Sequence, residues 1–242
     1  MNYYIMSDIH GCYDAFMNAL SNWDENKEHL VLMGDYIDRG PDSFKIIRTL
    51  MDLKEKYGNK VTVLKGNHED MLTSWLFSPK ELLVFYYNEH HRECLKSFLG
   101  LERYASLSRQ QRAEEMIYKF KKELHFMKNL DLYKETEHII FVHAGINLKG
   151  DWKQDETSLL WIREKFIYSS LTPEKRVFFG HTPTMTIHAD VDENNRYNNF
   201  DIYISEDNMK VGIDGGVSMG GQLNCLKVNE KGEIIEKFIF KK

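Results

Sequence analysis

Short apolar runs alternate with amphipathic stretches along the first 70 residues of the chain. Apolar runs at about 3–6, 29–33 and 61–64 have the length of buried β-strands. Between them, apolar residues recur at helical spacing over about 12–23 and 41–57, where Pro41 suits a first helical turn and Gly58 a stop. This strand–helix–strand–helix–strand order predicts a layered α/β domain.

The pattern changes near residue 70 and remains helical for about 60 residues. Leu, Met, Phe, Tyr, Lys and Glu recur at helical spacing over about 70–129, which predicts a mostly helical insertion. Within it, Ser108 and Gln111 have the spacing of a capping box and predict a helix that runs towards Lys122.

Strand signals return near residue 138 and dominate the last third of the chain. Apolar runs at 138–142 and 176–179 predict strands, and the stretch of about 158–167 predicts a helix. Four later runs, separated by turn residues, predict a second and largely antiparallel sheet at 197–204, 210–213, 222–228 and 234–240.

The predicted fold is therefore α/β, or α+β in some classifications, with two packed sheets flanked by helices. One sheet is expected to be mixed and the other largely antiparallel. We expect a single domain over 1–242 that carries the helical insertion at about 70–129.

Composition narrows the classes of protein that fit this chain. The formal net charge of −5 offers no basic field for nucleic acid or an anionic membrane. The three cysteines are sparse and far apart, which favours reduced thiols inside the cell. No leader-like segment and no apolar run of 18 residues is apparent. We expect a cytoplasmic protein without a nucleic-acid or membrane partner; the sequence does not indicate an oligomeric state.

Polar side chains follow five of the predicted strands. In α/β sheets, loops at the carboxyl ends of strands converge on the ligand site, so these side chains are expected to meet in space. One such histidine is more often structural than functional, but five clusters together indicate a site. The clusters are Asp8 with His10, Asp35 with Asp38 and Arg39, Asn67 with His68, His143, and His181.

These residue types point to a pair of metal ions. Asp, Asn and His without thiolates suit Mn²⁺, Fe or Zn²⁺, whereas Mg²⁺ prefers fewer imidazoles. One bridging carboxylate with further ligands would hold two ions about 3.5–4 Å apart, a geometry that activates water and polarises a phosphoryl oxygen. The residues thus favour hydrolysis of a phosphate ester with two divalent ions, Mn²⁺ first and Fe or Zn²⁺ as alternatives.

Five motifs in this order resemble the signature of the calcineurin-like metallophosphoesterases. They are Ser-Asp-Ile-His-Gly at 7–11, Gly-Asp-Tyr-Ile-Asp-Arg-Gly at 34–40, Gly-Asn-His-Glu at 66–69, His-Ala-Gly at 143–145 and Gly-His-Thr at 180–182. The closer resemblance is to the phosphoprotein phosphatase branch, in its bacterial and phage serine/threonine form.

The resemblance implies a role for each polar cluster in the site. Asp8 and His10 would hold the first metal, and Asp35 would bridge both ions. The remaining ligands of the second metal would be Asn67, His143 and His181.

The resemblance also implies the catalytic groups. A metal-bridging hydroxide would attack phosphorus, and His68, oriented by Asp38, would protonate the leaving oxygen. Arg39 would clamp the phosphate, joined by Arg163 from a Trp-Ile-Arg segment at 161–163. The alternative for Arg163 is a surface arginine that pairs with Glu164 or Glu156.

Three functions remain open at this point. Glu69, the Asp38–Arg39 pair and the 161–163 segment favour a serine/threonine, and possibly dual-specificity, protein phosphatase acting on phosphorylated proteins. The runs at 40–43 and 143–146 also occur in symmetrical diadenosine tetraphosphate hydrolases, which makes a dinucleotide polyphosphate the alternative substrate. A non-catalytic scaffold is disfavoured because the full set of expected ligands, His68 and Arg39 are present.

Overall fold

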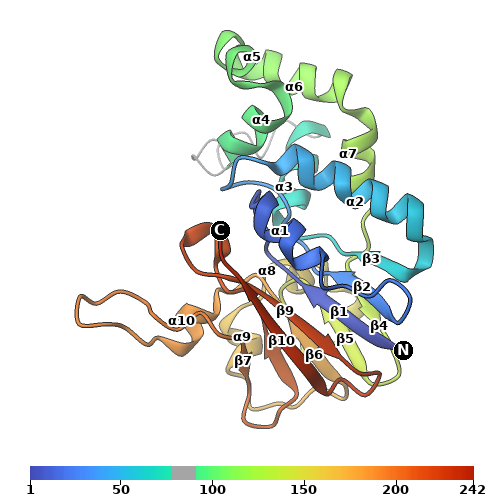
Figure 1. Cartoon of the computed structure of the whole chain (residues 1–242), viewed down its shortest axis with the longest axis vertical. Coiled ribbons are helices and arrows are strands. Elements are labelled where there is room, and N and C mark those ends of the chain that lie inside the picture. Colours follow the sequence, from blue (N-terminus) through green and yellow to red (C-terminus); the bar gives the residue numbers. More distant parts are fainter. Residues whose placement is uncertain (78–90) are drawn as a thin grey trace.

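The computed structural model describes residues 1–77 and 91–242, and two five-stranded sheets form its centre (Figure 1). In the first sheet, three parallel strands adjoin two antiparallel ones. In spatial order its strands are β10 (Ile234–Phe240), β9 (Leu223–Val228), β1 (Asn2–Met6), β2 (Glu28–Leu32) and β3 (Val61–Val63).

The second sheet has a parallel centre and an antiparallel strand at each edge. In spatial order its strands are β4 (Tyr133–Glu135), β5 (Ile139–Val142), β6 (Arg176–Phe179), β8 (Lys210–Gly212) and β7 (Tyr203–Ile204).

The predicted fold class is confirmed, but the last four strands do not form a sheet of their own. Strands β9 and β10 return to the first sheet, where β9 pairs with β1, and the second sheet is mixed instead of largely antiparallel. The predicted strand at 197–204 shrinks to the two residues of β7. Turn residues indicate where a strand begins and ends but not which strand it pairs with. The pairing of β9 with β1, which lies near the other end of the chain, was therefore not predicted.

Three apolar layers hold the sheets and helices together. Alternate residues of β1 point to opposite faces, so Ile5 enters the layer between the two sheets while Tyr4 and Met6 face the helices. The second sheet likewise divides its residues: Phe141 faces the first sheet and Val142 faces the helices on the outside. The result is a helix–sheet–sheet–helix sandwich.

Most of the helices cover the outer face of the first sheet, where Figure 1 shows α4–α7 in green beyond α2 and α3. On that side lie α1 (Tyr13–Leu20), α2 (Ser43–Tyr57), α3 (Asn67–Phe77), α4 (Arg92–Leu99), α5 (Leu101–Ser106), α6 (Arg109–Lys119) and α7 (Lys121–Lys128). Later in the chain come α8 (Glu156–Trp161), α9 (Glu164–Ile167) and α10 (Thr184–His188).

The described part of the expected insertion is helical. The capping box of Ser108 and Gln111 is present, although its helix ends at Lys119 and a new one begins at Lys121. Residues 78–90 of the expected 70–129 insertion lie outside the described residues. The single-domain assignment stays a prediction.

The helix predicted over 158–167 is broken in the middle. Ile162 has an extended backbone, and Arg163 follows with φ −129° and ψ −105°, between α8 and α9. A break at this point turns the Arg163 side chain away from the path of a continuous helix, a feature that apolar periodicity does not reveal.

Within 1–77 and 91–242, none of the helices combines the length and apolar character needed to cross a membrane.

Replacing Phe178 tests the apolar layer between the sheets. Its side chain is fully buried and lies against the Phe141 ring, with centroids 5.7 Å apart. Phe178→Ala is expected to lower the free energy of unfolding by about 3–5 kcal/mol, because it opens a cavity that rigid sheets cannot close. Chemical denaturation measures the change. Tyr168→Ala, at a side chain 62% exposed, is the control and should stay within about 0.5 kcal/mol; equal losses would contradict a packed layer.

Candidate metal centre

The loops that follow β1, β2, β5 and β6 lie against one another at the carboxyl ends of these strands. Their backbones are directly bonded: Asp8 N–H donates to Gly34 O (3.1 Å) and His10 N–H to Asp35 O (2.9 Å). On the second sheet, Gly180 N–H donates to His143 O (2.7 Å). The expected convergence of strand ends is therefore present.

Backbone strain is concentrated in these loops. Nine non-glycine residues in the described chain have positive φ, a conformation that costs free energy for side chains with a Cβ. Six of the nine are predicted site residues: Asp8, His10, Asp35, Asp38, Arg39 and His181. The fold holds their side chains in positions that an unstrained chain would not adopt.

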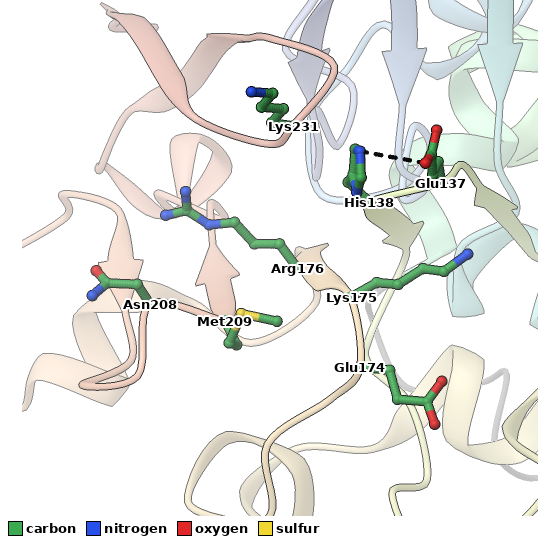
Figure 2. A pocket seen from close by; sticks show the side chains of 8 residues that line it. All are labelled: Glu137, His138, Glu174, Lys175, Arg176, Asn208, Met209 and Lys231. Carbon is green, nitrogen blue, oxygen red and sulfur yellow. Dashed lines mark ion pairs between the residues drawn. The ribbon is translucent and has the colours of Figure 1, made fainter.

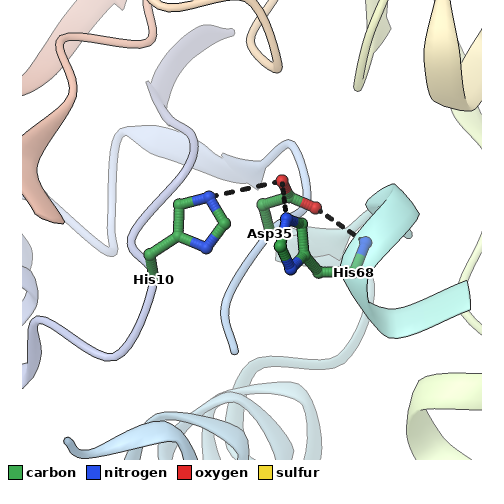
Figure 3. Close-up of side chains that lie close together, drawn as sticks. All are labelled: His10, Asp35 and His68. Atoms are coloured by element: carbon green, nitrogen blue, oxygen red, sulfur yellow. Dashed lines mark hydrogen bonds and ion pairs between the residues drawn. The ribbon is translucent and has the colours of Figure 1, made fainter. Parts of the chain in front are cut away.

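Asp35 lies at the centre of the site and belongs to two clusters of possible metal ligands. Figure 3 shows one of them, formed with His10 and His68. Its Oδ2 is 3.4 Å from His10 Nε2 and 3.8 Å from His68 Nε2. Its Oδ1 is 3.4 Å from His143 Nε2, in the cluster that also contains His181. One buried carboxylate thus presents one oxygen to each cluster.

The imidazole hydrogen bonds leave ring nitrogens that suit a cation. His10 Nδ1 bonds to Ile37 O (2.8 Å) and His143 Nδ1 to Met33 O (2.9 Å). A backbone carbonyl only accepts hydrogen bonds, so each ring donates from Nδ1 and turns its Nε2 towards Asp35. Histidines that ligate metals usually have this arrangement.

Unpartnered buried atoms also fit a metal pair. Among the described residues, His10 Nε2 and His181 Nε2 are buried without a hydrogen-bond partner. His143 Nε2 lies 2.9 Å from Asn67 Oδ1, a contact that lacks a donor when the ring proton is on Nδ1. A cation among these atoms would remove both defects, and the donor set of imidazole and carboxyl groups fits a dinuclear metal site.

Burial and neighbouring charges shift the pKa values of the predicted ligands. Burial lowers the pKa of His10 to about 3 and that of His181 to about 2, so both rings are neutral at physiological pH. Burial disfavours the charge of Asp35, yet His143, with the other surrounding histidines, lowers its pKa below the usual range. Burial and the nearby Asp35 raise the pKa of Asp8 to about 7. Such crowding of anions favours a bound cation.

Asp8 lies at the junction of the two sheets. Its carboxylate accepts the His181 N–H at 3.0 and 3.1 Å and the Ser7 hydroxyl at 2.5 Å. The cluster around His10 and Asp35 contains His68 in place of Asp8. The ligand roles of Asp8 and Asn67, like those of the other four residues, stay predictions.

The predicted acid pair is in contact. His68 Nδ1 lies 2.6 Å from Asp38 Oδ2, and both side chains are buried. Burial lowers the pKa of His68, but the charge of Asp35 and the contact with Asp38 outweigh it and raise the pKa to about 9. His68 therefore holds a proton at the edge of the cluster.

The two predicted phosphate-binding arginines have different surroundings. Arg39 is half-buried in the strained loop, with φ 65°. Arg163 Nη1 donates to His181 O (2.8 Å) and Thr182 Oγ1 (3.3 Å), so the pairing with Glu164 or Glu156 is absent from its described hydrogen bonds. The helix break brings this guanidinium to the His181 loop.

Glu69 supports the site in a way that sequence reasoning missed. Its fully buried carboxylate accepts backbone N–H groups of Asp35 (3.0 Å), Tyr36 (2.8 Å), Ile37 (3.2 Å) and Gly66 (3.0 Å). One side chain therefore fixes the loop after β2 against the loop after β3. Backbone N–H groups in a buried turn need hydrogen-bond acceptors, and this requirement is the signal that could have pointed to Glu69.

The Tyr36 hydroxyl performs a similar task at the strand ends. Its one proton lies between two acceptors, Leu32 O (2.9 Å) and Leu64 O (2.8 Å), and its oxygen accepts Gly34 N–H (2.9 Å). His91, which precedes α4, was also missed; it touches Asp38.

A separate surface cavity of about 440 Å³ lies at the opposite end of the second sheet (Figure 2). His138 precedes β5, Arg176 begins β6 and Met209 precedes β8, so the cavity adjoins the amino ends of these strands. Its charged lining is mixed, and Lys175 is already paired with Glu135 (2.8 Å). None of the predicted site residues lines it.

The Asp8 carboxylate lies where a side chain at residue 180 would be, and replacing Gly180 tests whether Asp8 binds metal. A Cβ there would lie 2.0 Å from Asp8 Oδ2 and 2.2 Å from Ser7 Oγ. Gly180→Ala is expected to weaken Mn²⁺ binding roughly 10–100-fold by displacing Asp8, as measured by calorimetric titration of metal-free protein. Gly150→Ala, where no atom lies within 4 Å of the added methyl, is the control. Unchanged affinity in Gly180→Ala would count against Asp8 as a ligand.

Curated relatives divide between two kinds of phosphatase. A symmetrical bis(5′-nucleosyl)-tetraphosphatase of Buchnera aphidicola is 41% identical over 71 residues, 28% of this chain and 24% of that enzyme; the chain thus covers about a quarter of the length of this relative. An asymmetrical bis(5′-nucleosyl)-tetraphosphatase of Anoxybacillus flavithermus is 28% identical over 95% of this chain and 91% of that one. Serine/threonine-protein phosphatase 1 of Salmonella typhimurium is 26% identical over 74% and 78%.

Solved structures share the fold at low identity. A putative diadenosine tetraphosphatase superposes with a TM-score of 0.62 at 18% identity, over 99% of this chain and 93% of that one. A serine/threonine phosphatase of Saccharomyces cerevisiae superposes with a TM-score of 0.59 at 13% identity, over 100% and 80%. These likenesses concern the fold alone.

The sequence profile of the calcineurin-like phosphoesterases matches residues 1–209, which include every predicted site residue. This match agrees with the two mixed sheets and with the buried clusters around Asp35. The chain belongs to the calcineurin-like phosphoesterase family.

Proposed function

We propose that this protein is a dinuclear-metal-dependent phosphomonoester hydrolase of the phosphoprotein phosphatase branch, acting on phosphoserine and phosphothreonine in proteins. The observation that carries the proposal is the buried Asp35, which presents one oxygen to each of two histidine clusters. Two clusters that share a carboxylate suit a pair of ions and the chemistry of phosphate esters.

The ligands proposed for the first ion are Asp8 and His10, with Asp35 shared between both ions. The second ion would be held by Asn67, His143 and His181. The proposed metal is Mn²⁺, with Fe or Zn²⁺ as alternatives. When bound, such ions polarise phosphoryl oxygens and lower the pKa of water, which supplies the nucleophile at neutral pH.

The chain's own residues would hold the phosphate and move the proton. Arg39 and Arg163 present guanidinium groups that match phosphate oxygens in planar pairs. His68 would deliver its proton from Nε2, because Nδ1 is occupied by Asp38. Asp38 keeps the ring in that orientation and stabilises its positive charge.

The acid pair is the reason to prefer phosphoproteins as substrates. A serine or threonine alkoxide is a poor leaving group and gains most from a proton donor, typically about 10²–10⁴-fold in rate. A nucleoside polyphosphate leaves as an anion that is already stable at neutral pH and needs such help less. A buried Asp–His pair beside the clusters therefore favours a phosphomonoester of an alcohol.

A dinucleotide polyphosphate is the second candidate substrate. The tetraphosphatase of Anoxybacillus flavithermus aligns with 95% of this chain, a larger share than the protein phosphatase of Salmonella typhimurium covers. Glu69 adds nothing to the choice, since its carboxylate bonds to backbone N–H groups instead of facing a substrate.

A parallel assay with Mn²⁺ decides between the two substrates. We expect kcat/KM for a phosphoserine peptide to exceed that for diadenosine tetraphosphate by about tenfold or more, because only the peptide needs the acid. Phosphate release and nucleotide chromatography measure the two reactions. The Asp35→Asn variant should lose both activities. A preference for the dinucleotide would assign the second candidate, and metal-independent activity would reject the dinuclear mechanism.

Replacing His68 tests the proton donor. His68→Asn keeps an N–H donor near the position of Nδ1, and so near Asp38, but removes Nε2. We expect kcat for the phosphoserine peptide to fall about 10²–10⁴-fold, while kcat for nitrophenyl phosphate, whose leaving group is stable as an anion, falls far less. Steady-state kinetics on both substrates give the ratio. Equal losses would remove the acid assignment.

A further inference from the structure

Two imidazole rings contact the same carboxylate oxygen of Asp38. His68 Nδ1 lies 2.6 Å and His91 Nδ1 2.5 Å from the same Oδ2. All three side chains are buried, with Asp38 fully so and His91 4% exposed. The two rings, tilted by 53°, have centroids 5.5 Å apart. His91 thus makes the same contact with the carboxylate as the proposed acid does.

These contacts have the geometry of hydrogen bonds and not of a third metal site. Two ligands of one tetrahedral ion, with bonds of about 2.1 Å, would lie roughly 3.4 Å apart. The separations from Asp38 Oδ2 are far shorter and match charge-assisted donation to a carboxylate. Both rings therefore carry a proton on Nδ1, and the carboxylate accepts twice.

His91 is one of three α4-side residues that contact the loop before α2 or the first turn of α2. His91, Cys94 and Ser97 are spaced by three residues and so share a helix face. Ser97 Oγ accepts Phe44 N–H (2.9 Å), and the buried Cys94 thiol adjoins the Ser43 hydroxyl and the Asp38 backbone.

Ser43 continues this chain of contacts. Its hydroxyl accepts Asp38 N–H at 3.0 Å. The backbone of Asp38 is strained, with φ 71°, and its contacts with Ser43 and Cys94 hold it there. The side chain of Asp38 still requires a restraint about its terminal torsion, which is intrinsically soft.

We propose that His91 is a positioning residue that fixes the Asp38 carboxylate so that His68 is aimed at the leaving group. The inference rests on the proposed role of His68 as proton donor. With two donors on Oδ2, rotation of the carboxylate would break both hydrogen bonds; with His68 alone, carboxylate and ring rotate together. A misplacement of about 1 Å at a reacting group can cost about 10²-fold in rate.

Two variants of similar size isolate the second hydrogen bond. His91→Asn carries an amide N–H near the position of Nδ1, whereas His91→Leu has nearly the same shape without a donor. We expect His91→Leu to lower kcat for the phosphoserine peptide about tenfold and kcat for nitrophenyl phosphate less than twofold, with KM unchanged. His91→Asn should recover most of the loss.

A structural role alone would give a different result. Equal losses of kcat on both substrates, or equal losses in His91→Leu and His91→Asn, would overturn the proposal. If His91→Leu does not fold, His91→Gln replaces it, because its amide lies near the position of Nε2 and away from Oδ2. Recovery in His91→Asn but not in His91→Gln supports the proposal, and activity retained in both overturns it.

A double-mutant cycle separates this proposal from the function on which it rests. In an Asp38→Asn background, His91→Leu should cause no further loss, because His91 acts through Asp38. Additive losses would overturn the positioning role. If His68→Asn shows selectivity for poor leaving groups and His91→Leu does not, only the His91 proposal fails. If His68→Asn shows none, the acid assignment itself fails.

Discussion

The structure depends on the burial of one carboxylate, Asp35, among histidines at the strand ends. Asp35 is 2% exposed, and His10 and His143 beside it donate their Nδ1 protons to backbone carbonyls. An isolated buried carboxylate is costly, and His68, the neighbour that holds a proton, lies 3.8 Å away and donates to Asp38. The fold therefore concentrates negative charge and bare nitrogen lone pairs at one place. A cation bound at this place would offset that charge.

The loops that carry the predicted ligands are held in place by residues that are not predicted to bind metal. Glu69 gathers four backbone N–H groups from two loops, and Tyr36 ties the ends of β2 and β3 together. Positive φ values at Asp8, His10 and His181 show the strain that these supports sustain. Glycines supply the remaining space, since a Cβ at Gly66 would lie 2.2 Å from Asp35 Oδ1.

Local sequence patterns were sufficient for the fold class and the convergence of the loops, and insufficient for the pairing of distant strands. Apolar runs followed by polar residues located the strand ends, because burial and chain reversal are encoded locally. The return of β9 to β1 depends on contacts between the two ends of the chain and has no local signal. The break at Arg163 and the approach of His91 likewise arise from packing between elements, which periodicity does not record.

The two sheets meet through an apolar layer that has no preferred direction, since the hydrophobic effect rewards burial and not alignment. Directional contacts across the seam include His143 Nδ1 with Met33 O and the His181 N–H with Asp8. Each joins a predicted ligand on one sheet to the loop or strand end of the other. The residues predicted to hold the ions thus also fix the position of one sheet relative to the other. A shift of either sheet would therefore displace the predicted ligands and lower the activity of the site.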